Sequence, residues 1–360
     1  MQEKELYVIK IGTNALVNSD GHIFNETINE VLGSAKEAMA QGKNIIIVTS
    51  GAARVGRLAL KDLQAPKKVA TCVGQPVLFS AWQEQAKKVD VILAEFLISR
   101  SSIIRKELFF PIRETFELLF ERGIVPVVNE NDVMVSGTGY SFGEGGNDSL
   151  AQVLAVSLKA SKLIIVSDIE GLCDSDPREN PDAKLIGEVD DITDKFIDLC
   201  SKKSGAGHGT GGMLSKLKSI RICTAVGVEC YIVSGLINGN VEKAVRGEPV
   251  GTHFLARESA DKVTERERWI LAAKSSAGSI AIDKGAVDAL AGGASLLAVG
   301  VKKVYGSFNE GEVIEIVDMN NHGVAFGIVD ISYAEIDEML RTKNTQKKLL
   351  VHANNLFFLK

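Results

Sequence analysis

The chain has few of the residues that build covalent or metal-bound frameworks. Among its 360 residues are five cysteines, which are odd in number, scattered and without a C-x-x-C pair. This pattern excludes a disulfide framework and a structural zinc site. The five histidines are isolated, with neither metal-ligand spacing nor a catalytic-triad signature. We therefore expect no metal site built from the protein's own side chains and no triad hydrolase.

Long hydrophobic runs and a charge of one sign are also missing. No segment approaches the ~18 apolar residues of a membrane span, and residues 6–9 are too few for a signal-peptide core. With 41 basic and 46 acidic residues the net charge is −5. No overall field therefore draws the chain to nucleic acid or to an anionic membrane. We expect a cytoplasmic protein with small-molecule partners.

The length of the chain exceeds what one hydrophobic core usually serves, so we expect two domains. Apolar, β-branched runs alternate with helical periodicity up to about residue 257, and a charged stretch follows. Short strand-like runs separated by glycines begin near residue 277. We predict a first domain at residues 1–257, a connector at 258–276 and a small β-rich domain at 277–360.

Six apolar runs in the first domain predict buried, parallel strands. They cover residues 6–11, 44–48, 91–98, 124–128, 163–166 and 229–233. Between them, Asn25 is expected to cap a helix that ends before Gly42, and residues 113–122 predict another helix. The predicted fold class is α/β, with an open, mainly parallel sheet sandwiched by helices. Ligands of such sheets bind beyond the carboxyl ends of the strands.

Polar residues cluster at these predicted strand ends and at helix starts. They include Lys10, Ser50, Asp132, Asn147, Asp148, Ser167 and Asp168. Each also has a structural interpretation: Lys10 can extend its charged end to solvent, Ser50 can belong to a plain turn, and Asp148 can cap a helix. Several such groups at one edge of a sheet favour a polar substrate site.

Residues 204–216 hold five glycines and run into an amphipathic helix that carries Lys216 in its first turns. Glycines let the backbone approach an anion, and a helix N-terminus attracts it. The structural interpretation is a flexible surface loop. No strand precedes the segment, as a dinucleotide fingerprint requires, and Met213 stands where a P-loop has its lysine. We predict a nucleotide site of another type.

In order and spacing, these motifs resemble the glutamate 5-kinases, members of the amino acid kinase family that carry a C-terminal PUA domain. The resemblance covers nearly the whole chain. In the first domain it rests on VIKIG at 8–12, IVTSGA at 47–52, VGQ at 73–75, VPVVNEND at 125–132, ND at 147–148, SDIEGL at 167–172, DPR at 176–178 and GTGGM at 209–213. In the second it rests on DKGA at 283–286, SLL at 295–297 and GSF at 306–308.

The resemblance implies transfer of the ATP γ-phosphoryl group to the side-chain carboxylate of L-glutamate, with Mg²⁺ accompanying the nucleotide. The product is L-glutamyl 5-phosphate, and the reaction is the first step of proline biosynthesis. The resemblance also implies a homo-oligomer. Feedback inhibition by proline and hand-off of the product to a glutamyl phosphate reductase follow from the same resemblance.

Residue roles carry over from the same motifs. Lys10 and Lys216 are the implied catalytic cations beside the transferred phosphoryl group, and Asp148 orients them. The implied ATP site comprises Lys10, Ser167, Asp168, Thr210, Gly211, Gly212, Met213, Leu214, Ser215 and Lys216. The implied glutamate ligands are Ser50, Asp132 and Asn147.

The sequence departs from the family pattern at three places. The segment SGAAR at 50–54 differs slightly after its first alanine, although Ser50 and Gly51 stand. Gly145 and Gly146 are extra residues before Asn147, and Phe326 stands where the PUA domain commonly has arginine. Residues 277–360 hold 8 Lys and Arg against 10 Asp and Glu, a balance of −2. This balance argues against a surface that tracks nucleic acid phosphates, so we favour a structural or regulatory role for the domain.

Two rival interpretations stay open. The first is another amino acid kinase that acts on aspartate, N-acetylglutamate or carbamate, against which the PUA-like tail argues. The second is a non-catalytic RNA-binding protein built on the same scaffold. Retention of Lys10, Asp148 and Lys216 argues against the second.

Overall fold

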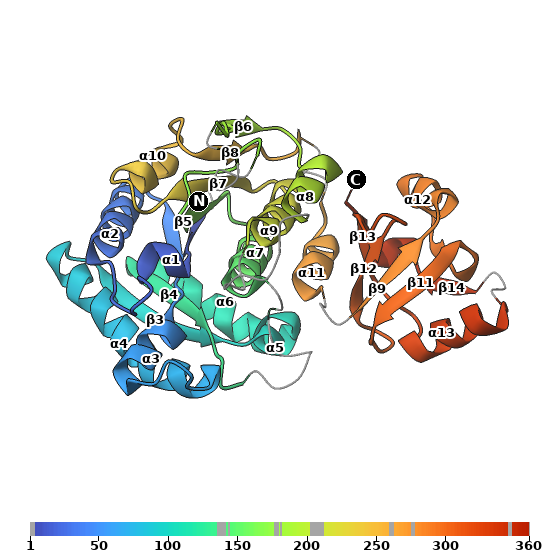
Figure 1. The fold of residues 1–360 in the computed structure, drawn as a ribbon, viewed down its shortest axis with the longest axis horizontal. Helices are drawn as coiled ribbons and strands as arrows, with labels where there is room; N and C mark the ends of the chain where they lie inside the picture. Colours follow the sequence, from blue (N-terminus) through green and yellow to red (C-terminus); the bar gives the residue numbers. More distant parts are fainter. Residues whose placement is uncertain are drawn as a thin grey trace. The chain divides into compact units, whose positions relative to one another are not determined.

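The computed structural model describes residues 4–134, 142, 145–175, 180, 182–201, 212–258, 263–274, 278–344 and 348–359. The chain divides into two compact units, with the division between residues 260 and 261 (Figure 1). Each unit has its own sheet. The predicted domain and connector boundaries stay predictions.

One eight-stranded sheet forms the centre of the first unit. Its strand order is β3-β4-β2-β1-β5-β7-β8-β6. Neighbouring strands pair in parallel except β7 and β8, which are antiparallel. The strands are β1 (Leu6–Ile11), β2 (Asn44–Val48), β3 (Ile92–Ile98), β4 (Ile124–Glu130), β5 (Lys162–Ser167), β6 (Glu188–Val189), β7 (Glu229–Ser234) and β8 (Thr252–Phe254). The predicted mainly parallel sheet is confirmed.

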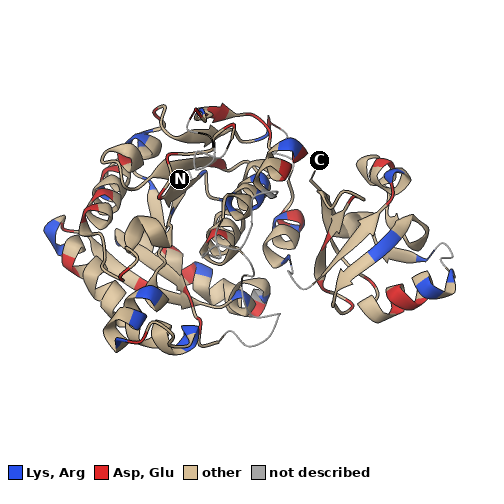
Figure 2. Cartoon of the chain, in the orientation of Figure 1, with Lys and Arg blue, Asp and Glu red and all other residues tan. Residues whose placement is uncertain are grey.

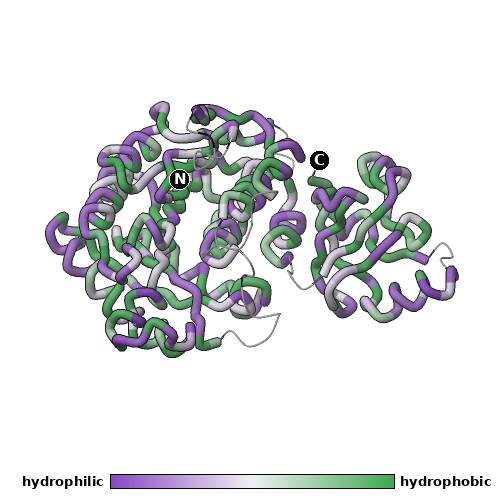
Figure 3. The backbone as a smooth tube through the Cα atoms, viewed as in Figure 1, coloured by the Kyte–Doolittle hydropathy of each residue, from purple (hydrophilic) through white to green (hydrophobic). Residues whose placement is uncertain are grey.

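Helices cover both faces of this sheet (Figure 1). They are α1 (Thr13–Leu16), α2 (Asn25–Ala40), α3 (Ala52–Leu60), α4 (Lys67–Lys88), α5 (Arg100–Ile104), α6 (Lys106–Glu121), α7 (Asn147–Ser157), α8 (Asp194–Ser201), α9 (Met213–Ala225) and α10 (Asn240–Arg246). Helices α1 to α4 and α10 share one apolar core with strand residues such as Ile9, Ile47 and Val166. Helix α7 packs against β1 and β5, and α9 packs against β7. Figure 3 shows the hydrophobic segments concentrated in the strands and on the inner sides of the helices.

Two local predictions are wrong. Helix α2 begins at Asn25 itself, with Phe24 as its N-cap and no side-chain cap. Strand β3, predicted to be buried, is an edge strand whose Ile92 is 64% exposed. A run of apolar residues predicts a strand, but its burial depends on strand order, which local sequence does not determine.

Helices α3 and α4 approach each other through glycines. A Cβ atom on Gly56 would lie 1.7 Å from the carbonyl oxygen of Ala70, and one on Gly74 would lie 1.9 Å from that of Ala52. No side chain larger than hydrogen fits at either position. The contact holds the start of α3, which follows Ser50, in a fixed position relative to α4.

The second unit is β-rich, as predicted. Its five-stranded sheet has the order β11-β9-β12-β13-β15, and β10 pairs with β14. The strands are β9 (Gly278–Ile282), β10 (Leu296–Leu297), β11 (Val301–Gly306), β12 (Val313–Val317), β13 (Gly323–Ile328), β14 (Leu349–Val351) and β15 (Leu356–Phe358). Its helices are α11 (Glu265–Ala273), α12 (Lys284–Ala291) and α13 (Tyr333–Thr342). A separate apolar cluster forms its core.

Helix α11 lies within the sequence predicted as a connector. A capping box between Thr264 and Glu267 fixes its start, and it packs against β13 and β15. Phe326, on β13, is 3% exposed, and the Lys274 ammonium lies 5.7 Å from the centre of its ring. This aromatic residue is therefore part of the packed interior of the second unit.

Charged residues of both signs are interspersed over the helices of the chain (Figure 2). Figure 2 therefore agrees with the nearly balanced composition. Among the residues that the structure describes, no helix combines the length and apolarity needed to cross a membrane.

The close contact between α3 and α4 predicts that one added methyl group at Gly74 strongly lowers the stability of the first unit. Gly74→Ala forces the α3 and α4 backbones apart, and we expect it to destabilise the first unit by about 3 kcal/mol or more. Urea unfolding followed by circular dichroism measures the change. Gly33→Ala is the matched control because nothing lies within 4 Å of its Cβ position on α2. This control should gain about 1 kcal/mol; equal stability of both variants would contradict the packing argument.

Candidate active site

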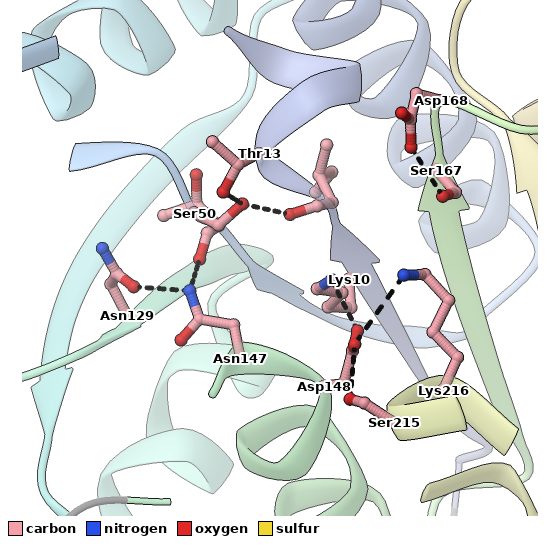
Figure 4. Close-up of polar contacts among 12 residues, drawn as sticks. Lys10, Thr13, Ser50, Asn129, Asn147, Asp148, Ser167, Asp168, Ser215 and Lys216 are labelled. Atoms are coloured by element: carbon pink, nitrogen blue, oxygen red, sulfur yellow. Dashed lines mark hydrogen bonds and ion pairs between the residues drawn. The ribbon is translucent and has the colours of Figure 1, made fainter. Parts of the chain in front are cut away.

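The polar residues predicted from the sequence meet at the carboxyl ends of β1, β2, β4 and β5 (Figure 4). Helices α7 and α9 add residues from one face of the sheet, and the turns after β1 and β2 add residues from the other (Figures 1 and 4). The edge predicted to bind ligands is therefore the edge where these side chains gather.

Strand pleating directs Lys10 toward helix α7. Alternate residues of β1 face opposite sides of the sheet, and Ile9 and Ile11 enter the core shared with α2. Lys10 therefore points to the other side. Its ammonium lies 2.5 Å from Oδ1 of Asp148, and its side chain is only 6% exposed. The alternative in which Lys10 extends into solvent is wrong.

Asp148 lies in the first turn of α7 but does not cap it. The N-cap is Gly146, whose φ of 47° and ψ of −121° suit glycine. Asp148 Oδ2 accepts a hydrogen bond from Ser215 Oγ at 3.1 Å and lies 3.9 Å from the Lys216 ammonium. The capping interpretation of Asp148 is therefore wrong, because its carboxylate serves groups on β1 and α9.

Lys216 is held in the site by the first turns of α9, which begins after Gly212. Burial lowers the pKa of Lys216, and the nearby Lys10 charge acts in the same direction, whereas Asp148 opposes the shift. The side chain is 8% exposed. The amino end of α9, whose peptide N–H groups favour anions, thus lies on the same side of the site as a buried ammonium group.

Two buried ammonium groups converge on the buried carboxylate of Asp148. The charge of Asp168 also acts on Lys216. Buried charge is costly unless it is paired. The arrangement therefore favours an anionic ligand beside Lys10 and Lys216.

A second hydrogen-bonded group follows β5. Asn14 donates to Asp168 at 3.0 Å, and Arg54 donates to Asn14 at 2.9 Å. Ser167 also donates to Asp168, at 3.2 Å. Burial alone raises the pKa of Asp168, but these hydrogen bonds outweigh burial and lower the pKa. The group joins α1, α3 and the end of β5, and keeps Asp168 ionised.

Ser50 lies in the turn between β2 and α3. Its hydroxyl donates to the carbonyl oxygen of Ile11 at 2.7 Å and accepts from Thr13 at 3.2 Å. Gly51, which follows, has a φ of +97°, and a Cβ there would lie 2.7 Å from a methyl group of Val17. The turn therefore requires glycine, and it fixes Ser50 against the turn after β1.

Asp132 follows β4 and is held by helix α4. Lys67 lies 2.7 Å from Oδ1 of Asp132, and Thr71 donates to Oδ2 at 3.0 Å. Asp132 is only 11% exposed, while Lys67 is 61% exposed. No helix-capping hydrogen bond to this carboxylate is found among the described residues.

Asn147, the first residue of α7, is tied to two strands. Its Nδ2 donates to the Thr49 carbonyl oxygen at 2.7 Å and to Asn129 Oδ1 at 2.9 Å. The Trp82 indole donates to the Thr49 hydroxyl at 3.0 Å and so fixes that end of β2. Gly145 allows the approach to α7, because a Cβ there would lie 2.2 Å from Ser149 Oγ.

The structure thus brings together most of the residues predicted from the sequence. The predicted residues Gly212, Met213 and Leu214 lie at the start of α9, while Thr210 and Gly211 lie outside the described residues. Several side chains that support the site were not among the predicted catalytic, ATP-binding or glutamate-binding residues. These are Thr13, Asn14, Arg54, Lys67, Thr71, Gln75, Glu95 and Asn129. Gln75 and Asn129 stand in motifs that carry the family resemblance. The other residues of this list stand in none of those motifs, and only folding brings them to the site.

Comparison with known proteins identifies the class. The amino acid kinase family model matches residues 5–234, and the PUA domain model matches residues 278–347. The solved carbamate kinase from Giardia lamblia, bound to AMP-PNP, has a similar fold, with a TM-score of 0.50 and 13% identity. The match covers 71% of this chain and 99% of that one. The chain belongs to the amino acid kinase family.

Curated relatives narrow the class. The chain is 34% identical to the glutamate 5-kinase of Pelagibacter ubique over 345 residues, which is 94% of this chain and 92% of the relative. It is 36% identical to the glutamate 5-kinase of Vibrio vulnificus over 331 residues, which is 90% of this chain and 86% of the relative. Within the amino acid kinases, the chain belongs with the glutamate 5-kinases, and the resemblance drawn from its motifs is confirmed.

The shared carboxylate predicts how the site responds to mutation. Asp148→Asn removes the carboxylate that two buried lysines share, so we expect a loss of about 3–5 kcal/mol in the free energy of unfolding. Ser215→Ala keeps every charge and removes one hydrogen bond, for which about 1 kcal/mol is expected. Urea denaturation at pH 7 compares the two. A neutral effect of Asp148→Asn would show that the lysines do not depend on this carboxylate.

Proposed function

We propose that this protein transfers the γ-phosphoryl group of ATP to the side-chain carboxylate of L-glutamate, the first step of proline biosynthesis. Family membership supports the reaction class and the substrate. The structural observation that carries the proposal is the pair of buried ammonium groups, Lys10 and Lys216, that converge on Asp148. In the transfer, a carboxylate oxygen of glutamate bonds to the γ-phosphorus while the bond to the β,γ-bridging oxygen breaks. The products are L-glutamyl 5-phosphate and ADP.

Phosphoryl transfer to a carboxylate requires the protein mainly to position the two substrates and to neutralise their negative charge. The attacking group is already a carboxylate, so no side chain has to remove a proton. Phosphoryl transfer depends on in-line positioning and on neutralising charge on the equatorial oxygens. Lys10 and Lys216 come from opposite elements of the site, β1 and α9, and can neutralise that charge from two directions. Asp148 is the residue that holds both ammonium groups in place.

We assign the nucleotide to the side of the site formed by β5 and α9. Ser167 ends β5 and Asp168 follows it, while residues 212–215 form the N-cap and first turn of the helix that carries Lys216. The N-terminal peptide groups of α9 favour phosphate. We assign glutamate to the other side, where Ser50, Asp132 and Asn147 are held by β1, α4 and β4.

Mg²⁺ fits this arrangement as a partner of the nucleotide. The ion prefers oxygen ligands, keeps several waters and commonly binds substrate phosphates with one or two carboxylates. Asp168 offers an ionised carboxylate on the nucleotide side, since its hydrogen bonds lower its pKa. Bound Mg²⁺ would neutralise phosphate charge. Homo-oligomer formation, inhibition by proline and hand-off of the product to a reductase stay predictions from the family resemblance.

Trapping the product tests the proposed function. The purified protein is incubated with Mg-ATP, hydroxylamine and, in turn, glutamate, aspartate and N-acetylglutamate, so that an acyl phosphate is captured as its hydroxamate. We expect product with glutamate. Product with another acid alone would keep the reaction class and overturn the substrate. No product from folded, ATP-binding protein would favour the non-catalytic interpretation.

The two lysines predict the largest losses of turnover. We expect Lys10→Ala and Lys216→Ala each to lower kcat by about 10²–10³, by analogy with other groups that stabilise charge in a transition state. Lys87→Ala, an exposed lysine near the end of α4, is the matched control and should keep normal turnover. The hydroxamate assay measures kcat, and circular dichroism checks folding. A correctly folded variant with normal turnover would remove that lysine from the mechanism.

A further inference from the structure

An arginine connects the helix after the Ser50 turn to the carboxylate after β5. Arg54 lies in α3, and its Nη2 donates to Asn14 Oδ1 at 2.9 Å. Asn14 lies in α1, and its Nδ2 donates to Asp168 Oδ2 at 3.0 Å. We call Arg54 and Asn14 the Arg54–Asn14 bridge. It begins on the proposed glutamate side of the site and ends on the proposed nucleotide side.

Arg54 is the fixed end of the Arg54–Asn14 bridge. Its Nη1 donates to the carbonyl oxygen of Val17, the C-cap of α1, at 2.7 Å. The donors of a guanidinium group lie in one rigid plane, so this bond at Nη1 also sets the direction of Nη2. The side chain is half-buried, which restricts it further. Arg54 therefore presents its Nη2 donor to Asn14 from a defined position.

The Asn14 side chain depends on its hydrogen bonds for its position. It is exposed, and an exposed side chain keeps its rotamer freedom unless a contact restricts it. Within the described part of the chain, its amide group is hydrogen-bonded to Arg54 and Asp168. Arg54 can only donate and an ionised Asp168 can only accept. The Asn14 amide suits both, because its carbonyl faces the cation and its NH₂ group faces the anion.

Asp168 depends on Asn14 more than on its other neighbours. Ser167 donates to Oδ1 of Asp168 at 3.2 Å, but it is the preceding residue of the same segment. Among the described side chains, Asn14 is the one from another element that donates to this carboxylate. Burial raises the pKa of Asp168, and the hydrogen bond from Asn14 is the largest influence that lowers it. Asn14 is therefore the main contact that holds the carboxylate in one direction.

The family resemblance assigns no role to either member of the Arg54–Asn14 bridge. Arg54 lies in the part of the segment SGAAR that departs from the family pattern, and Asn14 follows the motif VIKIG without belonging to it. The contact between them is a property of this chain that only the folded structure reveals.

We propose that Arg54 and Asn14 are positioning residues for nucleotide binding, which hold the Asp168 carboxylate in the place where it meets the nucleotide. The proposal rests on the proposed function, because that function assigns Asp168 to the nucleotide side. It makes a specific demand on Arg54. This residue follows the turn of a proposed glutamate ligand, yet its loss should weaken the binding of the nucleotide and not of glutamate.

Shortening the arginine tests this demand. Arg54→Met keeps an apolar stem and removes every donor, so Asn14 loses its fixed partner and Asp168 loses its support. We expect the KM for ATP, and the Kd for Mg-ADP measured by calorimetry, each to rise about fivefold, as for a partly exposed hydrogen bond to a charged group. The KM for glutamate should stay within about twofold of the original value.

Arg57→Met is the matched control. Arg57 lies on the same helix, is also half-buried and also donates to a backbone carbonyl oxygen, that of Ala65, at 3.2 Å. It makes no hydrogen bond to Asn14 or Asp168 in the described structure, so nucleotide binding should be unchanged. If Arg54→Met raised the KM values for ATP and glutamate equally, Arg54 would only support α3, and the proposal would be overturned.

A double-mutant cycle tests the link between the two residues. Asn14 is exposed, so Asn14→Ala should fold normally and weaken Mg-ADP binding at least as much as Arg54→Met. Because Arg54 acts through Asn14, Arg54→Met/Asn14→Ala should bind Mg-ADP as well as Asn14→Ala alone. Losses that multiply would mean independent effects and overturn the Arg54–Asn14 bridge. Normal Mg-ADP binding by folded Asn14→Ala would overturn it as well.

Failure of the proposed function gives a different result. If the unchanged protein binds Mg-ADP but forms no glutamyl hydroxamate, the proposed reaction is wrong, and the Kd values still decide the role of the Arg54–Asn14 bridge. If the unchanged protein forms the hydroxamate and Arg54→Met binds Mg-ADP equally well, the reaction stands and the Arg54–Asn14 bridge is wrong.

Discussion

The site depends on one carboxylate that serves two buried ammonium groups. Asp148 joins a lysine on the central strand to a lysine on helix α9, and its own helix, α7, lies between them. Each ammonium alone would be costly to bury, and Asp148 lies within reach of both. The fold therefore gathers two ammonium groups at one end of the sheet, and the same contacts hold three elements in register. Folding and ligand recognition rest on the same three side chains.

The rest of the site is organised by polar contacts that cross from one element to another. Each proposed glutamate ligand is held by a neighbour on a different strand or helix, as Ser50 is by Ile11 and Asp132 is by Thr71. Such contacts fix the positions of the groups before a ligand arrives. Preorganisation of this kind lowers the entropy cost of binding and of reaching an in-line geometry.

The sequence predicted the fold class and the residues of the site better than it predicted their partners. The bounds of β1 and β2 follow from apolar runs that local pattern alone reveals. Lys10 was predictable because a charge interrupts such a run. The sharing of Asp148 was not, since capping explains an aspartate in a first turn equally well. Glu95 carried no signal at all, because only the pairing of β3 with β4 brings it within reach of Gln75. The strand order determines which polar residues distant in sequence become hydrogen-bond partners, and the local pattern of apolar and polar residues does not encode that order.

The glycine contact between α3 and α4 has a consequence for motion. Helices whose backbones touch cannot slide past each other, because packed surfaces move between discrete arrangements rather than deform smoothly. The turn that carries Ser50 and the helix that carries Thr71 and Gln75 must therefore shift as one rigid body. Any displacement of this body relative to helices α7 and α9 would therefore preserve the geometry inside the body.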